Sequence, residues 1–304
     1  MSERKGILLV LATAIISGVS VYVNSVAVKF SNPYIFTGLK NAIVGIVFLS
    51  LILLFKEWKK VRELTHSQWM KLVAIGLIGG AVPFLLFFKG LTMTTAAKGG
   101  FIQKTMFLYV ALLAIVFLKE KMNKSFFIGL GALLFGNILF LGIKPQGLNW
   151  GDGLIFIATL LWAVEIVISK KALADLPANI VVWGRMFFGA VFIGLFLVNT
   201  HQLGPLFAYN LVQWKWIAIT SIFLVGYVFT FYHGLKHVRA SVATAVLAIG
   251  APITSLITII AQGNISWNVA KTWGVALMVA GVLLVIGFRQ IKSLLIKSSH
   301  VRTS

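Results

Sequence analysis

The sequence predicts an all-α, polytopic membrane protein with ten transmembrane helices, arranged as two inverted five-helix repeats. Three observations lead to this prediction: the composition, the length of the apolar segments, and a repeat with a period of roughly 145 residues. Of the 304 residues, 59% are hydrophobic and only 11% are charged, and the mean hydropathy is +0.97. Soluble domains carry about 25% charged residues, so this composition indicates a chain that is solvated by lipid.

Ten segments are long and apolar enough to cross a bilayer, which takes roughly 20 residues of helix. In order they are approximately residues 6–26, 34–55, 69–90, 95–118, 125–143, 151–170, 179–199, 214–234, 240–261 and 269–289. The first segment follows Arg4 and Lys5 as in a signal peptide, but it is too long for one and nine similar segments follow, so we expect it to be retained. Because the segments are continuously apolar rather than alternating, they predict helices and not the strands of a barrel.

The net charge of +20 is distributed unevenly along the chain. If the N-terminus is cytoplasmic, the cytoplasmic segments hold 18 of the 27 basic residues and the opposite segments hold 6. Cytoplasmic loops of membrane proteins carry the excess of Lys and Arg, so we expect a cell (inner) membrane protein with both termini in the cytoplasm. Residues 291–304 are then a basic cytoplasmic tail. We interpret the charge as topology and attraction to anionic lipid, and not as nucleic-acid binding.

The second half of the chain repeats the first at an offset of 145 residues. The landmarks that this offset aligns are Glu165 with Ser20, Arg185 with Lys40, and Gly274 and Gly281 with Gly129 and Gly136. We therefore place the first repeat at residues 1–145 and the second at residues 146–290. Because each repeat holds five helices, an odd number, the second must cross the membrane in the inverted orientation.

At these positions the sequence resembles the EamA branch of the drug/metabolite transporter superfamily, whose members are tandem five-helix repeats with both termini inside. The resemblance covers about residues 5–290, and the residues that carry it are Trp162-Ala163, Lys40, Arg185, Tyr232 with Gly234-Leu235, Ala251-Pro252 and Leu118-Lys119-Glu120-Lys121. The chain departs from the family at Leu108, where a proline is expected, at Asn264, where a second acidic residue is expected, and at Ser17, where a tryptophan is expected. The resemblance implies transport of amino acids, related metabolites or drugs, often outward.

Charged side chains inside a span are costly and usually face a cavity or a partner. Lys104 lies about nine residues into the fourth helix, roughly 13 Å along its axis, too deep to reach the outer headgroups easily. Lys40 and Arg185 lie nearer to helix ends, where long stems can also snorkel. The residues that we predict to bind the substrate or couple transport are Lys104, Glu165, Lys40, Arg185, Ser20 and Tyr232. For Glu165, an ion pair with Lys104 or Arg185 that only neutralises charge is an equal alternative.

Glycines and prolines within the spans predict where helices bend. They gather at Gly79-Gly80 with Pro83, at Gly99-Gly100, and at Gly250 with Pro252. The third, fourth and ninth helices are therefore the expected bending elements. The alternative is tight helix packing, which small residues favour in membranes.

An intramembrane enzyme, a channel and a lipid scramblase are the competing functions. The sequence has no HExxH motif, Walker loop or cysteine, so it offers no familiar catalytic or metal-binding set, and we expect no enzyme activity, metal or cofactor. An inverted repeat favours an alternating-access carrier over a channel or scramblase, and without an ATP-binding motif its drive is a gradient. We predict a secondary transporter of a small polar metabolite with an anionic or zwitterionic character, working in lipid, with a proton or a counter-substrate as coupling partner.

Overall fold

A computed structural model describes residues 3–94, 96–142, 147–262 and 267–287. These residues form helices joined by short loops, without a β-strand among them, and ten of the described helical segments are long and apolar enough to span a membrane. The prediction of an all-α, ten-span membrane protein is confirmed. Asn264 and the tail of residues 291–304 lie outside the described residues.

The ten spans are numbered here as helices one to ten. In the first repeat they are α1 (Glu3–Ala27) continued by η1 (Val28–Phe30), α2 (Pro33–Leu54), α4 (His66–Ile75) with η2 (Gly76–Ala81) and α5 (Val82–Leu91), α6 (Ala96–Lys104) with α7 (Met106–Leu118), and α8 (Lys124–Leu141). In the second repeat they are α9 (Trp150–Asp175), α10 (Ala178–Asn199), α11 (Leu211–His237), α12 (Ala240–Val246) with η4 (Leu247–Ile249) and α13 (Gly250–Gln262), and α14 (Val269–Ile286). Short helices α3 (Trp58–Arg62) and η3 (Gly204–Ala208) lie in loops.

Helix starts are set by local capping. Asn32 accepts hydrogen bonds from the first backbone N–H groups of α2, and Pro33 follows at the position where a missing N–H costs nothing. Reciprocal capping boxes begin α4 at Thr65, α9 at Asn149 and α11 at Asn210. Short polar side chains therefore mark where apolar helices enter the membrane.

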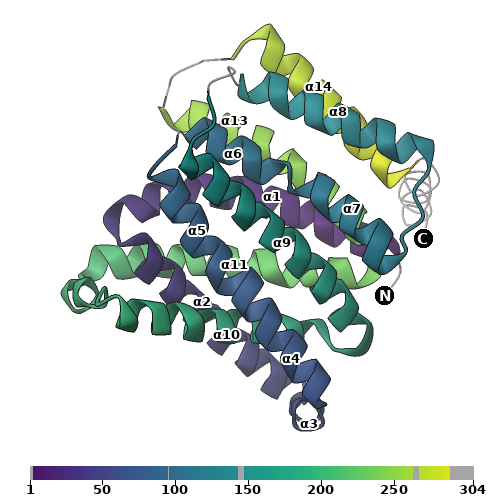
Figure 1. The fold of residues 1–304 in the computed structure, drawn as a ribbon. Helices are drawn as coiled ribbons and strands as arrows, with labels where there is room; N and C mark the ends of the chain where they lie inside the picture. Colours follow the sequence, from purple (N-terminus) through teal and green to yellow (C-terminus); the bar gives the residue numbers. More distant parts are fainter. Residues whose placement is uncertain (1–2, 95, 143–146, 263–266, 288–304) are drawn as a thin grey trace, which may run out of the picture.

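The inverted repeat is visible in how helices five and ten pack. In Figure 1, α8 and α14 lie side by side at the top of the molecule. A Cβ added to Gly129 would lie 2.7 Å from the Gly281 carbonyl oxygen, and one added to Gly136 would lie 2.8 Å from the Gly274 carbonyl oxygen. The 145-residue offset exchanges these two contacts, so the pseudo-two-fold axis passes between the two helices.

A second pair of glycine contacts obeys the same symmetry. Gly6 of α1 packs on Gly234 of α11, where a Cβ on Gly234 would lie 3.0 Å from the Gly6 carbonyl oxygen. Gly90 of α5 packs on Gly151 of α9, where each added Cβ would lie 2.7 Å from the other's carbonyl oxygen. Helices one and eight thus pack against each other as helices six and three do. This matching geometry relates the two repeats without reference to their sequence identity.

Helices three, four and nine are irregular, as the sequence predicts. Helix three contains a π-helical turn at Gly76–Ala81, and helix nine contains a 3₁₀ turn at Leu247–Ile249, directly before Gly250. Helix four is interrupted at Thr105, between α6 and α7, and not at Gly99-Gly100. The offset of 145 places the interruption of helix four opposite Gly250 of helix nine, so the two breaks are symmetry-related.

Candidate functional site

Glu165 lies in a buried polar cluster that joins four helices. Its side chain is 2% exposed, and its Oε1 accepts hydrogen bonds from the Ser169 hydroxyl at 2.5 Å and the Tyr232 hydroxyl at 2.6 Å. Arg185 Nε lies 3.8 Å from the same oxygen, close enough for an ion pair but without a hydrogen bond. Helices six, seven and eight therefore meet at one carboxylate oxygen.

The π-helical turn of helix three completes this cluster. An α-helix pairs each carbonyl with the N–H four residues on, but the residue four after Gly79 is Pro83, which has no N–H, and the π-turn departs further from the α-helical pattern. The Gly79 carbonyl accepts hydrogen bonds from Arg185 Nη2 at 3.0 Å and from Trp162 Nε1 at 3.2 Å. The next carbonyl, of Gly80, accepts one from Asn41 Nδ2 at 2.9 Å. The irregular turn thereby satisfies polar groups that lipid would leave without partners.

Gly79 is required at this position because the Glu165 side chain lies directly over it. A Cβ on Gly79 would lie 2.2 Å from Glu165 Cγ and 3.2 Å from Arg185 Nε. A Cβ on Gly80 would lie 2.5 Å from the Arg185 carbonyl oxygen. The two glycines allow helix three to approach helices six and seven closely enough for the ion pair to be enclosed.

Lys40 belongs to a separate polar chain between helices one and two. Lys40 Nζ donates a hydrogen bond to Asn24 Oδ1 at 2.5 Å, and Asn24 Nδ2 donates to the Ser20 hydroxyl at 2.9 Å. Lys40 is 9% exposed and its ammonium lies 4.8 Å from the centre of the Phe36 ring. Lys40 and Arg185 both point into the bundle, so neither snorkels to the headgroups as the sequence alone allowed.

Lys104 stands at the interruption of helix four, as the last residue of α6. It makes no hydrogen bond or ion pair with any residue that the structure describes, and it is half-buried. Thr105, which follows it, bonds back to the Ile102 carbonyl at 2.6 Å through its hydroxyl. The lysine therefore sits at a helix end whose carbonyls favour a cation, without a carboxylate to neutralise it.

The structure divides the six predicted residues into a cluster of three, a second cluster that contains two, and one residue that stands apart. Glu165, Arg185 and Tyr232 share one cluster, Lys40 and Ser20 share another through Asn24, and Lys104 joins neither. Of the two partners that the sequence offered Glu165, the structure selects Arg185.

Sequence reasoning missed several members of these clusters. Ser169 lies one helical turn after Glu165 and Asn24 lies one turn after Ser20, so the i, i+4 spacing of helical neighbours could have indicated both. Trp162 and Asn41 carry no such spacing signal. Their acceptors are the carbonyls of Gly79 and Gly80. Pro83 could have indicated the first, because a proline has no N–H to offer the carbonyl four residues before it.

The two symmetry-related half-helices differ in burial. We call the side of the bundle at which α1 begins the N-terminal side, and the opposite side the far side. Every residue of α12, the N-terminal-side half of helix nine, is buried, and so are Leu247 and Ala248. In α6, the far-side half of helix four, only Gly99 is buried among residues 98–104. The bundle is therefore closed on the N-terminal side and looser on the far side.

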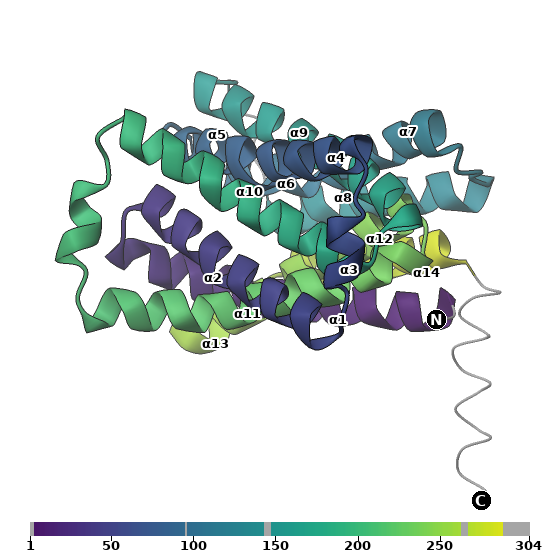
Figure 2. The ribbon, with the colours of Figure 1, turned by 90° about the horizontal axis from the view of Figure 1, so that it is seen from below.

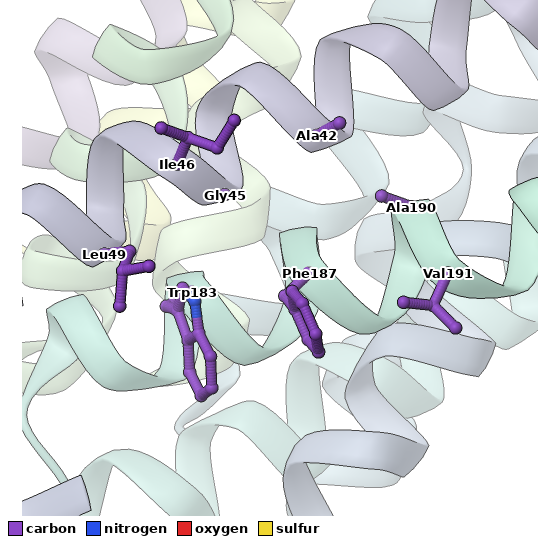
Figure 3. A pocket seen from close by; sticks show the side chains of 8 residues that line it. All are labelled: Ala42, Gly45, Ile46, Leu49, Trp183, Phe187, Ala190 and Val191. Atoms are coloured by element: carbon purple, nitrogen blue, oxygen red, sulfur yellow. The ribbon is translucent and has the colours of Figure 1, made fainter.

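A cavity of about 370 Å³ lies between α2 and α10, which run alongside each other and beside α11 in Figure 2. Figure 3 shows its wall, formed by residues 42–49 of α2 and 183–191 of α10, with the Trp183 and Phe187 rings stacked at 5.3 Å. All the lining residues are apolar, and Ile46 is 64% exposed. This groove belongs to the lipid-facing surface and contains none of the predicted site residues.

The described residues contain no group of three or more His, Cys, Asp or Glu side chains that could hold a metal ion. What the clusters offer is hydrogen bonding and charge: a carboxylate paired with a guanidinium, an ammonium held by an amide, and one ammonium without a partner. Groups of this kind can hold polar solutes by hydrogen bonding and charge.

Comparison with known proteins gives a consistent result. The sequence matches the EamA-like transporter family twice, over residues 4–142 and 149–287. It is 26% identical over 290 residues to the uncharacterized transporter YyaM of Bacillus subtilis (strain 168), covering 92% of this chain and 93% of that protein. It is 25% identical over 223 residues to the uncharacterized transporter sll1164 of Synechocystis sp. (strain ATCC 27184 / PCC 6803 / Kazusa), covering 66% of this chain and 63% of that one. A crystal structure that is 20% identical shares the fold, with a TM-score of 0.72 over 92% of this chain and 95% of the other.

Proposed function

Since this chain belongs to the EamA-like transporter family, we propose that it is a gradient-driven carrier of a small polar metabolite with an anionic group, such as an amino acid or a related solute. As a multi-pass transporter it has a small-molecule substrate and a lipid environment. The absence of any ATP-binding motif in the sequence favours a gradient as the drive, with a proton or a counter-substrate as the coupling partner. Outward transport is the direction that we favour.

The observation that carries the proposal of alternating access is the unequal burial of α6 and α12. The two half-helices are related by the inverted repeat, so an ideal symmetric structure would bury them equally. α12 is buried throughout, whereas Gly99 is the one buried residue among residues 98–104 of α6. Exchanging the two environments would close the far side and open the N-terminal side, which is how inverted repeats generate two access states. Such an exchange requires no unfolding, because both environments already exist in one structure.

The charges inside the bundle support an anionic group on the substrate. Glu165 is already paired with Arg185, whereas Lys40 is held only by a neutral amide and Lys104 has no partner among the described residues. Two cations thus remain without a carboxylate. In a low-dielectric interior an unpaired charge is costly, and a bound carboxylate or phosphate would lower that cost. We assign Lys104 the direct contact, because its ammonium, at the helix interruption, has no acceptor among the residues that the structure describes.

The test is transport by purified protein in liposomes, with radiolabelled anionic, zwitterionic and cationic metabolites offered in parallel. We expect saturable uptake of a solute with a carboxylate or phosphate, lost in Lys104→Ala and partly kept in Lys104→Arg, which retains charge but not geometry. Lys124→Ala is the matched control, because it removes a lysine from the first turn of α8, away from Lys104 and from both polar clusters. Unchanged affinity in Lys104→Ala contradicts the residue assignment, and a cation as the best substrate contradicts the charge argument.

We also propose that the N-terminal side faces the cytoplasm of a cell whose inner membrane holds the protein. The loops and helix ends on that side carry the basic runs at residues 56–62, 119–124 and 170–171, which is the pattern of cytoplasmic segments. Alkaline phosphatase fused after residue 304 should be inactive, and a green fluorescent protein fusion at the same position should fluoresce. Active phosphatase at this position would contradict the orientation.

A further inference from the structure

On the closed N-terminal side, an acidic side chain of the first repeat holds the start of α12, which belongs to the second repeat. Glu120 belongs to the first repeat, where it lies just after the end of α7, and α12 belongs to the second repeat. Glu120 Oε1 accepts a hydrogen bond from the Ala240 backbone N–H at 2.7 Å, and Oε2 accepts bonds from the Ser241 N–H at 3.4 Å and the Ser241 hydroxyl at 2.5 Å. The first N–H groups of a helix have no partner within it, so Glu120 supplies what α12 lacks and complements the positive end of its dipole.

The backbone aims Glu120 at this position. α7 ends at Lys119, which has a left-handed conformation with a φ of 54°, and the Glu120 N–H bonds back to the Ala114 carbonyl at 3.1 Å. The Lys119 N–H bonds to the same Ala114 carbonyl, and the two bonds together fix the direction of the chain that follows α7. The position of the carboxylate is therefore set by the end of helix four, the helix that also contains the Lys104 interruption.

Neighbouring contacts hold the corner between α11 and α12 in the same place. Arg239 donates a hydrogen bond to the Lys121 carbonyl at 2.9 Å and lies 5.7 Å from the centre of the Phe126 ring. Lys170 of α9 donates to the carbonyls that end α11, at 2.7 Å to Leu235 and 2.7 Å to Val238. Of these links, only those of Glu120 and Arg239 cross between the repeats, and only Glu120 contacts α12 itself.

The sequence provides this acidic residue in the first repeat but not at the equivalent position of the second repeat. At an offset of 144 residues, the position equivalent to Glu120 is Asn264, which has no charge. The half-helix related to α12 is α6, and α6 is the one that is half-exposed. The buried half-helix α12 thus has a charged acceptor, Glu120, whereas the residue in the equivalent place for α6, Asn264, is neutral.

We propose that Glu120 is a positioning residue for transport: a latch that holds α12 closed on the N-terminal side and thereby sets the balance between the two access states. Opening that side moves α12 away from the end of helix four and breaks the three Glu120 bonds, while α6 becomes enclosed. This inference rests on the proposed alternating access. It assigns to Glu120 no contact with the substrate, so its effect is on the equilibrium between states and not on the chemistry of binding.

The chain contains no cysteine, which allows a direct test by site-specific labelling. One reporter is Thr244→Cys, in α12, where Thr244 is 2% exposed, and the other is Gly100→Cys, in α6, where a new Cβ meets nothing within 4 Å. Each single-cysteine protein is treated with a membrane-impermeant maleimide, applied to Thr244→Cys from the N-terminal side and to Gly100→Cys from the far side. Each reporter is compared with and without the substitution Glu120→Gln, which keeps the shape of the side chain and removes its charge.

Glu120→Gln should raise the labelling rate at Thr244→Cys and lower it at Gly100→Cys, because population moves from one state to the other. Replacing charge-assisted with neutral hydrogen bonds predicts a change on the order of fivefold in the ratio of the two rates. Glu120→Asp should restore part of the original ratio. Glu63→Gln, which alters an exposed carboxylate 3.9 Å from Lys59, is the matched control and should leave both rates unchanged.

Two outcomes overturn the latch: no change at either reporter, or a rise at both, which would mean that Glu120 only supports the fold. A reciprocal shift supports it, whatever the liposome assay gives. If the reciprocal shift occurs and no solute is transported saturably, the latch stands and the transport proposal fails. If transport is saturable and the reporters do not respond, the carrier stands and the latch fails.

Discussion

Gly79 of helix three packs directly against the Glu165 side chain, and Gly79→Ala tests whether that close approach is required. The added Cβ would lie 2.2 Å from Glu165 Cγ and 2.8 Å from Glu165 Cδ. Carbon atoms in contact prefer separations of about 3.5–4.0 Å, so helix three or the Glu165 side chain must move by more than about 1 Å. Either movement disturbs the two hydrogen bonds at Glu165 Oε1 and the carbonyl that Arg185 uses.

The expected cost follows from overpacking a filled interior, about 1–3 kcal/mol. Gly100→Ala is the matched control, since it adds the same methyl group to a helix where nothing lies within 4 Å. In that variant the gain in helix propensity, up to about 1 kcal/mol, is not opposed by a clash. Thermal unfolding in detergent should therefore give a lower melting temperature for Gly79→Ala, by roughly 2 °C or more for each kcal/mol, and no loss for Gly100→Ala. Equal melting temperatures for the two variants would refute the packing argument.

Two further substitutions test the interior at other points. Tyr232→Phe removes one of the two hydrogen bonds to Glu165 Oε1 and should destabilise the protein by about 1.5–3 kcal/mol, whereas Tyr109→Phe removes only a neutral bond of 3.3 Å to Thr105 and should cost less; equal unfolding midpoints would contradict this. Gly281→Leu places a side chain 2.7 Å from a backbone oxygen of α8 and should lower the melting temperature, whereas Gly131→Leu, with open space around it, should not; a stable Gly281→Leu would show that helices five and ten do not need their close approach.

Much of the architecture could be predicted from the sequence because lipid imposes simple rules. Apolar length gives the spans, and an odd number of helices in each repeat gives the inversion. The matched glycines at positions 129, 136, 274 and 281 indicated a relation between helices five and ten, and the structure shows that these glycines form the contact itself. Gly79-Gly80 and Gly250 likewise marked helices that are irregular.

The details of the polar clusters could not be predicted, for a physical reason. A long side chain such as Lys40 can point toward headgroups or into the bundle, and only the position of a neighbouring helix, here the one that carries Asn24, decides. The partner of Arg185 is the carbonyl of Gly79, which Pro83 leaves without its helical N–H, but the sequence does not show which side chain takes that place. The interruption of helix four falls at Thr105, five residues past Gly100, so the glycine pair marked the helix but not the position of the break. A proline in the sequence indicates which carbonyl lacks a helical partner, but it does not indicate which side chain will bind that carbonyl.

The most direct test of the central claim, that this chain is an alternating-access carrier, is counterflow in proteoliposomes. Vesicles are loaded with unlabelled solute, diluted into a trace of the same labelled solute, and followed over time, with protein-free vesicles as the control. A carrier predicts transient accumulation of label above its equilibrium level and an initial rate that saturates with concentration, because one site must return across the membrane in each cycle. A rate that rises linearly with concentration, with no accumulation of label, would contradict the account and indicate a channel.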